Sequence, residues 1–134
     1  MTGVLEYLDG EGFDAGEEYA RLLAKYDGTP RWRKVFGLLR HLLGARDKFE
    51  AHQKRVSEFR PYKSQKSGRI YSVYLAEPAP DDPEGPFFAY LALKTATGPL
   101  IYAIYCGDRN NRHSSVFYDE VWAEVVQRLA LKGL

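Results

Sequence analysis

The spacing of apolar residues changes near Ile70, and this change constrains the fold more than any other feature of the chain. Before it, one apolar set is spaced as on a single helix face: Tyr19, Leu22, Leu23 and Tyr26. The seven residues from Ile70 onward instead alternate between two faces, as in a strand. The sequence therefore predicts helices first and a sheet later, which is typical of an α+β protein.

Two helices are expected before this change. Asp14 is a suitable N-cap for the first helix, with Glu17 completing a capping box, and Gly28 ends it. Thr29-Pro30 begins a second helix, whose apolar period runs to Gly44. Because one or two residues separate the helices, we expect an antiparallel helical hairpin.

Strands are expected in four places. Residues 4–8 form a short apolar strand, and residues 70–76, 87–93 and 100–106 form three more. Short connections between the last three predict an antiparallel sheet, with the helices covering one of its faces. The stretch 59–69, with its proline, glycine and bases, is expected to be a loop.

A C-terminal helix is expected after the serine pair 114–115. On this helix we expect Trp122 and Val125 to be buried against the sheet, and Glu124 and Arg128 to be solvated. With 134 residues, the chain has the length of one domain. The expected architecture is thus an N-terminal strand and helical hairpin on an antiparallel sheet, closed by a C-terminal helix, in a single domain of residues 1–134.

Composition excludes several classes of protein. The single cysteine, Cys106, excludes an intrachain disulfide and a cysteine-based zinc site, and it is expected to be a small buried hydrophobe. The three histidines share no metal-ligand spacing, and no glycine motif for nucleotide phosphates is present, so we expect neither metal nor cofactor. The chain has no long apolar run and no basic N-terminal leader. We therefore expect a cytoplasmic protein without a membrane segment.

Charge is strongly segregated along the chain. Residues 1–30 contain seven acids and two bases, whereas residues 31–75 contain twelve bases and three acids. A basic block of this kind can bind a polyanion, or it can pair with the acidic N-terminal region.

The segment 107–118, here called the corner, holds the first set of candidate site residues. Arg109 and Arg112 are expected to stabilise charge on a phosphate, and His113 and Tyr118 to move protons. The alternative is a polar connection whose serine caps the last helix. A corner arginine is expected to contribute little to stability.

A second candidate set precedes the strands and would bind RNA: Arg60, Lys63, Lys66 and Arg69. We expect this set to share one concave face with Arg109 and Arg112, with strand tyrosines offering stacking surfaces.

These motifs resemble the RelE/HigB superfamily of bacterial toxins, which cleave mRNA on the ribosome. The helical hairpin ahead of a strand meander is similar to the family's element order. Residues 59–63, followed by 70–74, resemble the basic loop and the strand with which the family's sheet begins. Residues 104–109 and 115–118 are similar to its last strand, its Gly-x-Arg corner and its closing Ser-x-Val-Tyr segment.

The resemblance implies a metal-independent endoribonuclease of a toxin–antitoxin system, with RNA or the ribosome and an antitoxin protein as partners. It implies that Arg109 contacts the scissile phosphate. The family's C-terminal tyrosine falls on Phe117 in strict register and on Tyr118 one place later. Lys63 and Lys66 match the basic residues ahead of the sheet.

One alternative stays open, because the family's catalytic strand bases are missing. Residues 70–76 contain no base, and residues 87–93 contain no arginine. This departure favours a non-catalytic binding module on the same scaffold, one that inhibits or docks a protein partner. Whether the protein is an enzyme is therefore not decided by the sequence.

Overall fold

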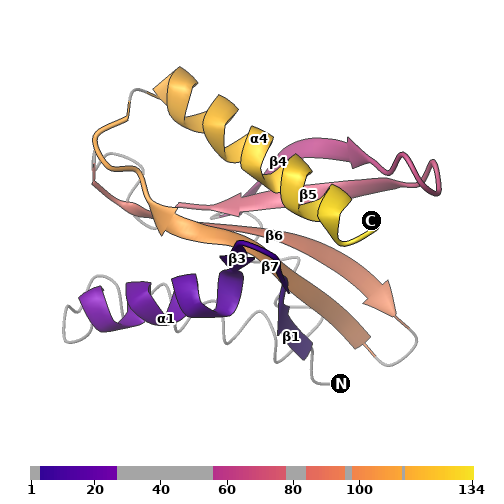
Figure 1. Cartoon of the computed structure of the whole chain (residues 1–134), viewed down its shortest axis with the longest axis horizontal. Helices are drawn as coiled ribbons and strands as arrows, with labels where there is room; N and C mark the ends of the chain where they lie inside the picture. Colours follow the sequence, from indigo (N-terminus) through magenta and orange to yellow (C-terminus); the bar gives the residue numbers. More distant parts are fainter. Residues whose placement is uncertain (1–3, 27–55, 78–83, 96–97, 113) are drawn as a thin grey trace.

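A computed structural model describes residues 4–26, 56–77, 84–95, 98–112 and 114–134 (Figure 1). The expected second helix, from Thr29-Pro30 to Gly44, lies outside the described residues. The described elements are β1 (Val4–Tyr7), β2 (Asp9–Gly10), β3 (Phe13–Asp14), α1 (Ala15–Tyr26), β4 (Val56–Lys63), β5 (Ile70–Ala76), β6 (Pro86–Thr95), β7 (Gly98–Asp108) and α4 (Ser114–Leu131). The α+β class expected from the sequence is confirmed.

Five of the described strands form one mixed sheet in the order β1-β7-β6-β5-β4. Strands β5, β6 and β7 are antiparallel neighbours joined in sequence, as expected, and β4 adds a further antiparallel strand beside β5. Strand β1 departs from the expectation because it pairs with β7 in parallel, with Val4 opposite Leu100. A short turn dictates an antiparallel pair, but the long chain between β1 and β7 imposes no such direction.

The expected loop at 59–69 is wrong for its first half, since Val56–Lys63 is strand β4. Pro61 lies in this strand at the edge of the sheet, where a residue without an N–H is tolerated. A bulge at Phe59 shifts the register between Glu58 and Arg60. The chain then turns back into β5, with the Ser64 N–H donating to the Arg69 carbonyl at 2.8 Å.

The two described helices cover opposite faces of the sheet, which corrects the expectation of one covered face (Figure 1). Phe87 and Phe88 are neighbours on β6, so their side chains point to opposite faces. Phe87 packs against Phe117 of α4, whereas Phe88 packs against Tyr19 of α1. Both faces of the sheet's centre are therefore buried.

Helix α1 begins as the sequence predicts. The Glu17 N–H donates to Asp14 Oδ1 at 3.1 Å, so Asp14 is the N-cap. The carboxylate of Glu17 pairs with Arg21 one turn later rather than closing a capping box. Tyr19 and Leu22 are buried, as their spacing predicts.

Helix α4 buries a regular stripe of side chains four residues apart: Phe117, Val121, Val125 and Leu129. Trp122 is only partly buried, at the margin of this core, and Glu124 is half-buried. Arg128 is 5% exposed, so its expected place in solvent is wrong. Its guanidinium reaches the edge of β7, where it pairs with Glu18 and also with Glu124.

Candidate functional site

The corner begins with a tight turn. Asn110 and Asn111 have φ angles of 54° and 60°, and the Arg112 N–H donates to the Arg109 carbonyl at 3.1 Å. Positive φ at both central positions is the pattern of a type I′ turn, and asparagine tolerates it better than most residues. The turn sends the chain from β7 into α4.

Arg109 is buried, although a corner arginine is expected to contribute little to stability. Its side chain is 9% exposed and pairs with Glu77, whose side chain is 12% exposed. Arg109 Nη2 also donates to Tyr118 Oη at 3.2 Å, and Tyr118 Oη donates to Glu77 Oε1 at 2.9 Å. The three groups form a closed, partly buried network, here called the Glu77 cluster.

Arg112 is used by the corner itself. Its Nε donates to the Arg109 carbonyl at 2.7 Å, and its Nη2 donates to the Asp108 carbonyl at 2.8 Å. Its Nη1 pairs with Glu120 on α4 at 2.8 Å. Arg112 therefore ties the turn to the start of the helix. His113 lies outside the described residues.

Sequence reasoning missed Glu77, the acid of this cluster. Glu77 begins a stretch rich in prolines and acids, which reads as a solvated loop. Its position directly after β5 was the available signal, because a residue at a strand end stays close to the sheet. The carboxylate, guanidinium and phenol together are the kinds of group used in metal-free acid–base chemistry.

The second candidate set behaves differently. Lys63, Lys66 and Arg69, here called the basic turn, are exposed. In the part of the chain that the structure describes, no carboxylate forms an ion pair with any of them. Arg69 lies over the ring of Tyr71, with Cζ 5.4 Å from the ring centroid. Positive charge thus remains available to a ligand at this turn.

Arg60 does not belong to this available group. It pairs with Asp119 of α4 at 2.9 Å, and its Cζ lies 5.7 Å from the ring centroid of Trp122. The guanidinium therefore bridges β4 and α4.

The expected shared concave face for the two candidate sets is wrong. Lys63 pairs with Ile70 at the start of β5, whereas Glu77, which holds Arg109, follows the end of β5. The seven residues of β5 separate the sets by roughly 20 Å. The reason is the direction of the strands. Strand β6 lies antiparallel between β5 and β7, so β5 and β7 run in the same direction and their ends lie on the same side of the sheet.

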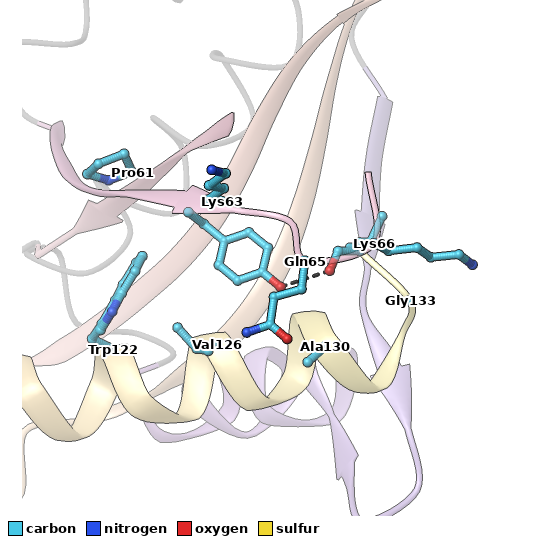
Figure 2. Close-up of a pocket in the computed structure, with 10 residues that line it drawn as sticks. Pro61, Lys63, Gln65, Lys66, Trp122, Val126, Ala130 and Gly133 are labelled. Atoms are coloured by element: carbon cyan, nitrogen blue, oxygen red, sulfur yellow. Dashed lines mark hydrogen bonds between the residues drawn. The ribbon is translucent and has the colours of Figure 1, made fainter. Parts of the chain in front are cut away.

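A groove lies beside the basic turn, between β4 and α4 (Figure 2). Its volume is about 420 Å³. The strand side and the turn contribute Pro61, Tyr62, Lys63, Gln65 and Lys66, and the helix side contributes Trp122, Val126, Ala130, Gly133 and Leu134. The Tyr62 hydroxyl donates to the Leu134 backbone oxygen at 2.8 Å, and this hydrogen bond joins the strand side of the groove to its helix side.

Cys106 is buried, as expected for a small hydrophobe. Burial raises the pKa of its thiol well above the usual value, and the nearby Glu18 carboxylate acts in the same direction. A buried, protonated thiol is not a nucleophile. Cys106 therefore belongs to the core and not to a site.

Within the described residues there is no group of three or more histidine, cysteine, aspartate or glutamate side chains placed to hold a metal ion. Among those same residues, no helix is both long and apolar enough to cross a membrane. No family model, curated protein or solved structure matches this chain.

Proposed function

We propose that the protein binds single-stranded RNA through the basic turn, on a scaffold of the RelE type. The observation that carries this proposal is the contrast between the two corner arginines and the basic turn. Arg109 and Arg112 are each paired with a glutamate, whereas Lys63, Lys66 and Arg69 are exposed without a described acid partner.

Charge that is already paired inside the protein gives little attraction to a ligand, because binding must first break the internal pair. Exposed basic side chains without an acid partner bind phosphates favourably, because their binding releases the counterions held by the nucleic acid. The turn between the basic side chains is made of small residues: Ser64, Ser67 and Gly68. Gly68 has a φ of 72°. A phosphate backbone can therefore approach the turn closely.

The test is fluorescence anisotropy with a labelled single-stranded RNA over a range of salt concentrations. Lys63→Gln, Lys66→Gln and Arg69→Gln should each weaken binding and lower the salt slope by about one. Arg21→Gln is the matched control, because Arg21 lies on α1 and its side chain is 72% exposed. Wild-type binding that does not respond to salt, or equal losses in the control, would contradict the proposal.

An acidic protein segment is the other anionic ligand such a turn could accept. A pull-down with RNase treatment separates the two. If binding to an acidic partner survives RNase and the RNA titration shows no binding, the protein is the partner-docking module and not an RNA-binding protein.

A second function, endoribonuclease activity, is favoured by the Glu77 cluster alone. In this reaction Glu77 would take the proton from an RNA 2′-hydroxyl, which attacks the adjacent phosphorus. The P–O5′ bond breaks, Arg109 stabilises the charge, and Tyr118 protonates the leaving oxygen. The phosphate would have to displace Glu77 from Arg109, so opening of the cluster is part of this mechanism.

Cleavage of mRNA is tested by incubating the protein with transcripts, with and without ribosomes, and mapping the ends. A 2′,3′-cyclic phosphate that disappears in Glu77→Gln and in Tyr118→Phe supports the enzyme. Uncut RNA in both conditions contradicts it. An active enzyme of this kind would act as a toxin and would have an antitoxin protein as its partner.

A further inference from the structure

We infer that the groove between β4 and α4 binds one unstacked nucleotide of the RNA, with its base between apolar walls and its phosphate near the lysines. This inference rests on the proposed RNA binding and names the part of the RNA that the groove contacts. The volume of about 420 Å³ lies within the range of about 300–1,000 Å³ for small-ligand sites.

The walls of the groove suit a planar base. Pro61 and Trp122 lie at one end, and Val126 and Ala130 follow along α4 (Figure 2). Trp122 is only partly buried, so part of its indole is accessible from the groove. Bases released from a stack commonly pack against aromatic side chains in proteins that bind single-stranded RNA.

Contacts with Phe59 and Arg60 hold the Trp122 ring in place, so the wall is formed before any ligand arrives. The Trp122 ring meets Phe59 edge-on, with centroids 5.7 Å apart and an interplanar angle of 90°. Arg60 lies over the same ring, and Asp119 holds the Arg60 guanidinium. A wall held in place in advance loses little entropy on binding.

The polar groups of the groove suit the rest of a nucleotide. Lys63 and Lys66 lie on the strand and turn side, and the Lys66 side chain runs beside Gly133 (Figure 2). None of the ten lining side chains is acidic. Gln65 directs its side-chain amide into the groove, where it can meet a base edge (Figure 2). A phosphate at the rim and a base inside match this distribution.

The site is tested by nuclear magnetic resonance titration with three probes: adenosine 5′-monophosphate, adenosine and inorganic phosphate. The monophosphate should shift the Trp122 indole signal and the backbone amides of Lys63, Gln65 and Lys66. Adenosine should shift the same signals with weaker affinity. Phosphate alone should shift only the lysine region. Shifts from phosphate equal to those from the monophosphate would mean that no base enters the groove, and would overturn the inference.

Ala130→Phe fills the groove and should weaken binding of the monophosphate at least about tenfold, the scale of one lost stacking contact. Ala123→Phe is the matched control, since Ala123 is also exposed on α4 but does not line the groove. It should change the affinity less than about twofold. Equal effects of the two variants would contradict the inference.

The same variants separate this inference from the proposed function. If Ala130→Phe abolishes nucleotide binding and also weakens RNA binding, both stand. If RNA binding keeps its affinity and salt slope in Ala130→Phe, the basic turn binds RNA but the groove does not contribute. If the monophosphate binds while RNA does not, the groove is a free-nucleotide site and the proposed function fails. If an acidic peptide shifts the Trp122 signal and the monophosphate does not, the groove is a peptide site.

Discussion

Glu18 of α1 and Arg128 of α4, 110 residues apart, join across the free edge of β7. Arg128 Nη1 lies 2.7 Å from Glu18 Oε1 and donates to the Ile104 carbonyl at 2.9 Å. Glu18 Oε1 accepts the Cys106 N–H at 3.3 Å. Because β1 pairs with β7 only along residues 100–103, the backbone beyond would otherwise lack a partner on that side. The ion pair takes the place of a strand.

This pair should be essential for stability. Arg128→Met leaves the Glu18 carboxylate without its cation at a site where the arginine is 6% exposed, and should lower the free energy of unfolding by about 3–5 kcal/mol. Adding Glu18→Gln should recover part of this loss. Urea denaturation provides the measurement, with Arg21→Met as the exposed control, expected to cost less than about 1 kcal/mol. Equal costs for the two arginines would show that the edge pair has no special role.

Arg109 should also stabilise the fold, contrary to the expectation for a corner residue. Removing it by Arg109→Met leaves Glu77 and Tyr118 without their cation and should cost about 3–5 kcal/mol. Tyr118→Phe removes one hydroxyl from the same network and should cost about 1 kcal/mol. Thermal and urea unfolding of both variants measure these losses. A stable Arg109→Met protein would place this arginine outside the structural core.

The turn at the corner should depend on its asparagines. At Asn111, with φ of 60°, Asn111→Gly should leave stability unchanged or slightly higher, because glycine adopts this conformation freely. Asn111→Val should lower the free energy of unfolding by about 1–2 kcal/mol, since a branched side chain is strained there. Equal stability of the glycine and valine variants would mean that the turn does not hold this backbone conformation in solution.

Stability should fall at alkaline pH through Cys106. Burial raises the pKa of its thiol, so the folded state keeps a proton that the unfolded state loses. Its contribution is complete below the unfolded thiol pKa of about 8.5 and is lost as pH rises toward the higher folded pKa. Urea unfolding at about pH 7 and about pH 9.5 measures the change, and Cys106→Ala should reduce the slope with pH. An unchanged slope in that variant would assign the effect to other groups.

Much of the fold follows from local patterns. Asp14 caps α1, and the strand alternation after Ile70 yields β5, because capping and alternation need only neighbouring residues. Strand β4 was not predicted, since Pro61 and the surrounding bases favour a loop when its neighbour on the sheet is unknown. The candidate site was predicted less well. The residue types were found, but Glu77, the partner that occupies Arg109, was missed.

The sequence by itself determined the two described helices, the three antiparallel strands β5, β6 and β7, the buried cysteine and the basic turn. These depend on spacing, short connections and composition, all of which are local. The tertiary structure alone decided that β1 pairs in parallel, that Arg128 lies at the edge of β7, and that Lys63 and Arg109 lie at opposite ends of β5. The physical reason is that these outcomes depend on contacts between residues far apart in the chain. Whether a basic side chain is available to a ligand or already paired depends on an acid far away in the sequence. Local sequence patterns cannot predict that pairing.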